Sequence, residues 1–213
     1  MTGAALPTVV FDFAGVVFGW QPPLLLQQVL PQRVVDAASA QHWAAQIFQG
    51  YDGDWAEFDR GTVAPADLVA RIAKRTGLSP VEVQAVVGAV PLALQPIAET
   101  VALIRQLHAA GHPLFFLSNM PAPYADHLER QHSFLQCFQD GIYSARVLLI
   151  KPERAIYDLA ARRFGRAPGE LLFFADVVAN VAAAQQAGWQ ACHFTGAASA
   201  RQALATAGYD LGR

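Results

Sequence analysis

Residues 8–19, TVVFDFAGVVFG, carry the strongest indication of the fold of this chain. The first six residues of this stretch, Thr8–Phe13, are β-branched or aromatic apart from one aspartate, and such a run is typical of a buried strand. A carboxylate is costly to bury without a partner, so Asp12 near the end of this strand needs a cation or hydrogen-bond donors. Gly15 follows and allows the chain to turn sharply.

Further segments of strand length follow, and helical patterns separate them. The strand candidates are Leu114–Leu117, Leu171–Phe174, Ala191–Thr195 and the weaker Ile142–Val147. The helical patterns lie at Ile97–Ala110, Glu153–Phe164 and Asn180–Ala187, and each stops at a glycine. This alternation predicts an α/β fold with a parallel sheet and helices on both faces. Right-handed crossovers place the carboxyl ends of all strands at one edge, where ligands bind.

The stretch from about Gly19 to Val90 breaks the alternation, because it contains no convincing strand. Helical patterns occur at Leu24–Leu30, Val34–Phe48, Ala66–Thr76 and Pro80–Val87, and turn signals occur at Gly50–Asp54 and Gly61–Pro65. We therefore expect a Rossmann-like core domain at residues 1–18 and 91–213. A small all-helical cap at residues 19–90 is inserted after the first strand and is expected over the strand ends.

The composition excludes several classes of function. The chain has 213 residues, of which 54% are hydrophobic and 15% charged, and its net charge is −2. This supplies a large core and no electrostatic surface for nucleic acid. Cys137 and Cys192 are too few for a disulfide framework, so we expect reduced thiols. No apolar run approaches the roughly 18–20 residues of a membrane span, so we expect a cytoplasmic protein, either a monomer or a homodimer, without a membrane partner.

Several polar side chains are expected together at the carboxyl edge of the sheet. Asp12 and Asp176 end two strands, Ser118 and Asn119 follow a third, and Lys151 precedes a helix. Two carboxylates at one edge repel each other, so a cation explains both, and hard oxygen ligands suit Mg2+. Each residue taken alone is also compatible with a helix cap or with surface charge. Their common placement is what indicates a site.

The motifs FDFAGVV, LSN, KPE and FFADVVAN resemble, in this order, those of the haloacid dehalogenase superfamily. The resemblance covers roughly residues 8–196. The insert resembles the family's first type of helical cap. Its segment FDRGTVAPADLVARIAKRTGLS is similar to the cap of the branch that contains glucose-1-phosphate phosphatases and the N-terminal phosphatase of soluble epoxide hydrolase.

The resemblance implies a role for each matching residue. It makes Asp12 the nucleophile and Lys151 the residue that orients the nucleophile and the phosphate. It implies that Mg2+ is held by Asp12, the carbonyl of Ala14 and Asp176. It implies that phosphate is bound by Ser118, Asn119 and Lys151.

Two departures from the family pattern affect the chemistry. Most family phosphatases have a second aspartate two residues after the nucleophile as general acid and base, whereas Ala14 cannot transfer a proton. Loss of such assistance slows a reaction on the order of 100- to 10,000-fold, and least for a good leaving group such as an anomeric or acyl phosphate. In the sugar-phosphatase branch this position is often glycine. In the fourth motif Ala175, Val177 and Ala179 surround Asp176, so fewer carboxylates are present for Mg2+.

The sequence therefore predicts a Mg2+-dependent phosphatase that hydrolyses a small phosphorylated metabolite through an aspartyl-phosphate on Asp12, with sugar phosphates among the candidates. A second hypothesis is a family member that has lost catalysis, given Ala14 and Ala175, and binds a ligand or a protein. A third is a 2-haloacid dehalogenase, in which Asp12 attacks carbon without metal. Asp176 opposes this third hypothesis, because it would repel a carboxylate substrate.

Overall fold

The computed structural model describes residues 6–50 and 52–212 and contains a parallel sheet of five strands. The strands are β1 (Thr8–Phe11), β2 (Leu114–Ser118), β3 (Asp140–Tyr143), β4 (Leu171–Ala175) and β5 (Gln190–His193), in the spatial order β3-β2-β1-β4-β5. The predicted α/β class is confirmed. The chain runs from β1 outward to β3 and then returns to place β4 on the other side of β1. The strand order therefore reverses between β1 and β4.

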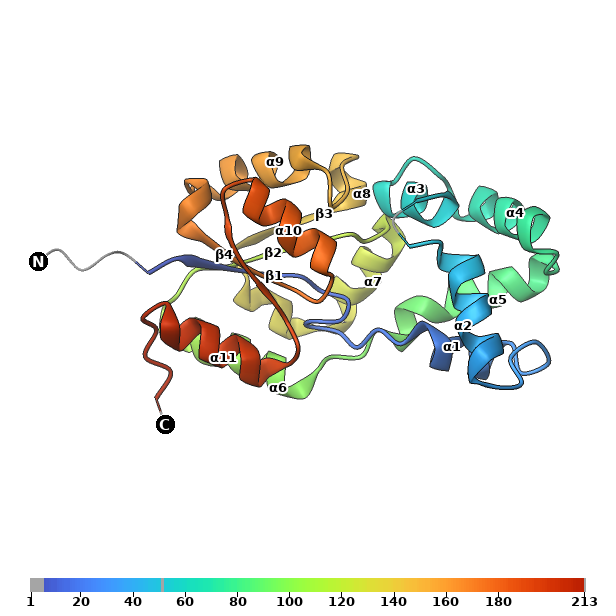
Figure 1. The fold of residues 1–213 in the computed structure, drawn as a ribbon, viewed down its shortest axis with the longest axis horizontal. Coiled ribbons are helices and arrows are strands. Elements are labelled where there is room, and N and C mark those ends of the chain that lie inside the picture. The colour runs from blue at the N-terminus through green and yellow to red at the C-terminus, as the bar shows by residue number, and fades with distance from the viewer. Residues whose placement is uncertain (1–5, 51, 213) are drawn as a thin grey trace, which may run out of the picture.

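The sheet is buried on both faces, which explains why its inner strands are almost entirely apolar. Alternate residues of a strand face opposite sides, so Val9 and Phe11 enter one core and Val10 enters the other. The first core is shared with α6 (Ala98–Ala109), α7 (Ala122–Gln131) and α11 (Ala197–Thr206), and the second with α9 (Arg154–Phe164) and α10 (Val178–Gln186). Figure 1 shows α9 and α10 on one side of the sheet and α6 and α11 on the other. Cys137 and Cys192 pack against the first core as free thiols.

Among the described residues, six helices lie between β1 and β2, and we call the first five the helical segment. They are α1 (Pro22–Val29), α2 (Ala37–Phe48), α3 (Asp54–Arg60), α4 (Pro65–Thr76) and α5 (Pro80–Ala93). Figure 1 shows the helical segment beyond one end of the sheet, away from α11. Helix α3 was not predicted, because seven residues between two glycines, Gly53 and Gly61, give little periodicity. Within the described ranges, no helix is both long and apolar enough to cross a membrane.

The third strand differs from its prediction at both ends. The sequence indicated Ile142–Val147, whereas β3 starts at Asp140 and the chain then enters the short helix α8 (Ser144–Val147). Asp140 and Gly141 are poor strand formers, which hid the start of β3. Packing requires this glycine, since a Cβ there would lie 2.1 Å from the Phe116 ring. Two short 3-10 helices, Ser133–Cys137 and Pro168–Glu170, complete the regular structure of the described residues.

A tyrosine of the core satisfies a carbonyl of the helical segment. Helix α5 runs past its predicted end at Val87 and contains Pro91. Proline has no N–H, so the carbonyl of Val87 four residues earlier lacks its helical donor. The hydroxyl of Tyr124 on α7 donates to this carbonyl over 2.7 Å, and both residues are buried. The bond permits α5 to continue to Ala93, where Val90 and Leu94 reach the junction with the core.

We expect Tyr124→Phe to lower the free energy of unfolding by about 1–3 kcal/mol, because it leaves the buried Val87 carbonyl without a donor. The same substitution in a Pro91→Ala background should be less costly, since an alanine at this position supplies the missing N–H. Urea denaturation of wild type, Tyr124→Phe, Pro91→Ala and the double variant measures the loss in free energy of unfolding in each background. An equal loss in the two backgrounds would contradict the pairing of Tyr124 with Pro91.

Candidate active site

Asp12 and Asp176 follow the two strands between which the strand order reverses. Phe11 of β1 pairs in register with Phe174 of β4, and the Asp12 N–H donates to the Phe174 carbonyl over 2.9 Å. The two aspartates therefore leave neighbouring strand ends at the carboxyl edge of the sheet, where open α/β sheets bind ligands. Both line one cavity. The structure thus places Asp12 and Asp176 at the same edge of the sheet, as the strand pattern predicted.

A buried ion pair joins Asp12 to Lys151. The distance between Lys151 Nζ and Asp12 Oδ2 is 2.5 Å, and the two residues are 1% and 4% exposed. The ammonium also donates to the Leu117 carbonyl over 2.9 Å, and the Phe13 N–H donates to Asp12 Oδ1 over 2.8 Å. Burial raises the pKa of the Asp12 carboxyl, while the Lys151 charge and these donors act in the opposite direction. The partners of both charges offset the cost of removing them from water.

The side chain of Asn119 positions Lys151. Its Oδ1 accepts from the Lys151 N–H over 2.8 Å, and its Nδ2 donates to the Lys151 carbonyl over 2.9 Å. Both polar atoms of the amide are thus engaged with the backbone of the residue that carries the ammonium. This role differs from the direct phosphate contact that the sequence predicted for Asn119, although the residue does line the cavity.

Ser118 lies at the end of β2 but is fully buried. Its hydroxyl makes a long contact of 3.4 Å with the Asn119 carbonyl. Among the described residues, those that line the cavity include Asn119 and not Ser118. Of the predicted phosphate-binding residues, Lys151 and Asn119 therefore border the open space, and Ser118 lies beneath it.

Gly15 makes room for the Asp176 carboxylate. It adopts φ +78°, which glycine tolerates best, and a Cβ at this position would lie 2.0 Å from Asp176 Oδ2. The chain turns tightly here, and Ala14 beside it also lines the cavity. Burial, followed by the nearby charge of Asp12, raises the pKa of Asp176 to about 6. The fold thus holds two carboxyl groups close together at the cost of mutual repulsion.

The donors at this edge fit a magnesium ion. Asp12, Asp176 and the carbonyl of Ala14 are hard oxygen ligands, and Mg2+ takes few carboxylates and keeps several waters. Asn180 on α10 lines the same cavity, and its buried Oδ1 has no hydrogen-bond partner among the described residues. A metal-bound water would satisfy that oxygen. Among residues 6–50 and 52–212, no group of three or more His, Cys, Asp or Glu side chains has the arrangement of a metal site.

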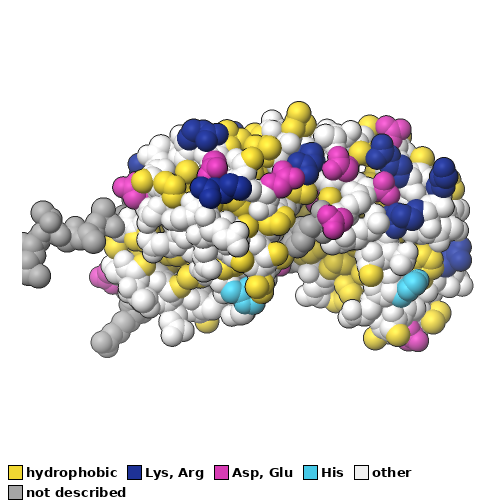
Figure 2. All heavy atoms as spheres, turned by 45° about the horizontal axis from the view of Figure 1, so that its top comes forward, with side chains coloured by type: hydrophobic (Ala, Val, Ile, Leu, Met, Phe, Trp, Pro, Cys, Tyr) yellow, Lys and Arg dark blue, Asp and Glu magenta, His cyan; other side chains and the backbone are white. Residues whose placement is uncertain are grey.

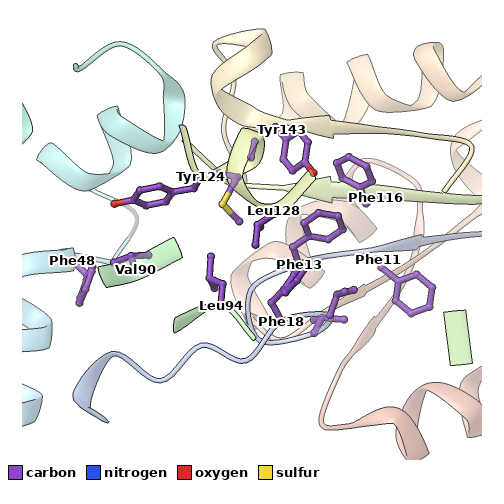
Figure 3. Packing of buried hydrophobic residues seen from close by; sticks show 14 of the residues in the cluster. Phe11, Phe13, Phe18, Phe48, Val90, Leu94, Phe116, Tyr124, Leu128 and Tyr143 are labelled. Carbon is purple, nitrogen blue, oxygen red and sulfur yellow. The ribbon is translucent and has the colours of Figure 1, made fainter. Parts of the chain in front are cut away.

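The cavity has a volume of about 370 Å³ and lies between the sheet edge and the helical segment. Its polar end holds the groups just described, whereas most of its remaining lining is apolar. The apolar wall residues include Trp20, Phe48, Trp55, Val90, Leu94, Met120, Tyr124 and Ile150. Figure 3 shows apolar side chains leading from Phe48 through Val90 and Leu94 to Phe18 of the core. Figure 2 shows the surface narrowing between the core and the helical segment, with acidic and basic side chains interspersed over both.

Asp59 is a third carboxyl group on the cavity wall, and the sequence analysis missed it. It belongs to α3 of the helical segment. Burial raises its pKa to about 7, and the charge of Lys151 opposes this shift. Nothing in the sequence distinguishes Asp59 from its neighbours Asp54 and Glu57, which pair with arginines. Only the docking of α3 over the strand ends selects it.

Comparison with known proteins places these features in a family. The chain matches the family model described as haloacid dehalogenase-like hydrolase over residues 6–188. A sesquiterpene phosphatase of Aspergillus oryzae is 28% identical over 187 residues, which are 87% of this chain and 88% of that protein. An (S)-2-haloacid dehalogenase of Pseudomonas putida is 30% identical over 101 residues, which are 47% of this chain and 44% of that protein.

Solved structures share the fold. A HAD family enzyme of Bacteroides thetaiotaomicron, in complex with magnesium and inorganic phosphate, superposes with a TM-score of 0.69 at 17% identity and covers 89% of this chain and 94% of its own. The L-2-haloacid dehalogenase of Xanthobacter autotrophicus, with chloropropionic acid covalently bound, superposes with a TM-score of 0.66 at 18% identity. The match covers 89% of this chain and 77% of the dehalogenase. Phosphate-binding and dehalogenating proteins thus resemble this fold about equally.

We expect Lys151→Met to lower the free energy of unfolding by about 3–5 kcal/mol, because it leaves the Asp12 charge buried without its cation. The double variant Asp12→Asn/Lys151→Met should recover part of this loss, since no charge then remains unpaired. Thermal or urea unfolding at pH 7 of wild type, both single variants and the double variant measures the coupling. Additive losses would show that the two side chains do not depend on each other.

Proposed function

Because this chain belongs to the haloacid dehalogenase-like hydrolase family, as its match over residues 6–188 shows, we propose that it is a Mg2+-dependent phosphatase with Asp12 as nucleophile. The observation that carries the proposal is the buried Asp12–Lys151 ion pair at the end of β1, on the wall of a cavity that also holds Asp176. The ion pair orients a carboxylate oxygen, and the cavity offers space for a phosphoryl group beside it.

The proposed reaction has two steps, and it uses the side chains at the carboxyl edge of the sheet. A carboxylate oxygen of Asp12 attacks phosphorus, the bond from phosphorus to the leaving oxygen breaks, and an aspartyl-phosphate forms on Asp12. Lys151 balances charge on the transferring group and keeps Asp12 oriented. Asp12, Asp176 and the Ala14 carbonyl would hold Mg2+, which would supply positive charge for the phosphoryl oxygens. Water then attacks phosphorus, and inorganic phosphate leaves as the Asp12 carboxylate is restored.

The charges around the cavity favour phosphate transfer with a metal over dehalogenation without one. Of the described residues that line it, Lys151 alone is cationic, whereas Asp12, Asp59 and Asp176 are acids. An anionic haloacid would meet this acidic set with one lysine that is already paired. The relative that is a phosphatase also spans 87% of this chain, against 47% for the dehalogenase. Both observations support the phosphatase.

The walls of the cavity favour an apolar substrate over a sugar phosphate. Sugar hydroxyls need hydrogen-bond partners, and the side chains above the acidic end are chiefly aromatic and aliphatic. We therefore propose a phosphate monoester with a hydrocarbon chain as the substrate, and the helical segment as the cap that encloses that chain. The name of the Aspergillus oryzae relative, a sesquiterpene phosphatase, supports this choice.

The proposal is tested by phosphate release from a panel of prenyl and alkyl monophosphates and of sugar phosphates, each with Mg2+ and with EDTA. We expect release from the hydrocarbon esters only, dependent on Mg2+ and abolished in Asp12→Asn. Negligible release from wild type and Asp12→Asn alike would favour a family member without catalysis. Chloride release from 2-chloropropionate in EDTA would instead indicate a dehalogenase.

Trp20→Ala tests the proposed role of the apolar wall. Trp20 is partly buried on the cavity wall and packs edge-on against Phe48. We expect kcat/KM for a long-chain alkyl phosphate to fall about tenfold, which corresponds to about 1.4 kcal/mol or roughly two buried methylene groups. Acetyl phosphate, which has no such chain, should be little affected.

Trp43→Ala is the matched control for Trp20→Ala. Trp43 is also partly buried in the helical segment, but it donates to the Arg33 carbonyl and does not line the cavity. A similar loss in both variants, or an equal loss for both substrates, would contradict the assignment of Trp20 to the binding of the hydrocarbon chain.

A further inference from the structure

We propose that Asp59 of the helical segment is the general acid and base of this enzyme, in place of the acid that position 14 lacks; the inference rests on the proposed phosphatase activity. Ala14 follows the nucleophile by two residues and carries no proton. Asp59 lines the same cavity as Asp12 and Lys151 and approaches it from α3 of the helical segment. The proton-transfer group would thus come from another part of the chain.

Helix α3 is fixed to the core, so Asp59 has a defined position. The buried Ser144 hydroxyl donates to the Asp59 carbonyl over 2.5 Å and accepts from the Met120 N–H over 2.8 Å. Arg60, the next residue, pairs with Glu153 of the core at 2.6 Å. This hydrogen-bond bridge to the backbone carbonyl of Asp59 and this ion pair of the next residue hold the end of α3 against the core.

Close packing after α3 reinforces this anchoring. Gly61 has φ +86°, and a Cβ there would lie 2.7 Å from the carbonyl oxygen of Ala145 in α8. The helix end therefore lies directly on the core backbone. A side chain held by such contacts has the positional precision that proton transfer needs.

The Asp59 carboxyl is available for chemistry. No protein group among residues 6–50 and 52–212 donates a hydrogen bond to it, whereas the neighbouring Glu57 and Asp54 are engaged with arginines. The groups that face it across the cavity are Lys151, which interacts with it electrostatically, and Tyr124. Burial raises the pKa of Asp59 to about 7, so both protonation states are accessible near neutral pH.

Asp59 donates one proton in the first step of the reaction and regains one in the second. When Asp12 attacks phosphorus, the bond between phosphorus and the ester oxygen breaks, and the leaving alkoxide takes the proton of the Asp59 carboxylic acid. The alcohol departs and Asp59 is a carboxylate. In the second step Asp59 takes a proton from water as that water attacks phosphorus, the bond from phosphorus to Asp12 breaks, and the Asp59 acid is restored.

Leaving-group dependence tests this role. In Asp59→Asn we expect kcat/KM for decyl phosphate, whose alkoxide needs a proton, to fall about 100- to 10,000-fold. Formation of the phosphoenzyme from p-nitrophenyl phosphate should be little changed in rapid-quench experiments, because nitrophenolate leaves unaided. Breakdown of that phosphoenzyme should be slow, so Asp59→Asn should accumulate it and release a burst of nitrophenol. Asp59→Glu should recover part of the decyl phosphate activity.

Asp54→Asn is the matched control, since it removes an acid from the same helix without touching the cavity. It should retain wild-type kinetics with both substrates. Equal losses for decyl and p-nitrophenyl phosphate in Asp59→Asn, without a burst, would overturn the proposal and indicate a role in substrate binding or cap structure. Failure of the phosphatase itself is distinguishable, because wild type would then release no more phosphate than Asp12→Asn.

Discussion

The buried contact between Asp12 and Lys151 is the interaction on which the rest of the site depends. Two charges removed from water must be satisfied by each other and by further polar groups, or the fold loses several kcal/mol. The Phe13 N–H, the Leu117 carbonyl and the Asn119 amide meet this requirement from three different segments. Hydrogen bonds to and around this one ion pair therefore join the ends of β1 and β2 to the loop before α9.

Positive charge is scarce at the carboxyl edge of the sheet. One lysine faces three carboxyl groups among the described residues of the cavity wall, and Gly15 permits Asp176 to approach although the approach is electrostatically unfavourable. A divalent cation would relieve the repulsion, and burial raises the pKa of Asp59 to about 7, so that this carboxyl is partly protonated near neutral pH. Electrostatics and geometry therefore lead to the same expectation, which is a site that takes an anionic phosphoryl group together with a metal.

The helical segment and the core are joined by polar contacts as well as by apolar packing. Tyr124 completes the hydrogen bonding of α5 at the position where Pro91 interrupts it, and Ser144 links α3 to the loop after β2. Each bond satisfies a backbone group that would otherwise be buried without a partner. The wall that supplies Asp59 and the apolar surface is consequently positioned by the same core that positions Asp12.

The parallel sheet and the placement of Asp12, Asp176 and Lys151 near its carboxyl edge could be predicted from the sequence alone. Buried strands and capped helices are local patterns, and the handedness of the crossovers places all strand ends at one edge. The sequence did not reveal helix α3, the start of β3 or the engagement of Asn119 with the Lys151 backbone. It also did not distinguish Asp59 from other surface acids or indicate an apolar cavity. Those features arise where segments distant in the chain meet, so only tertiary packing decides which side chains face the same enclosed space.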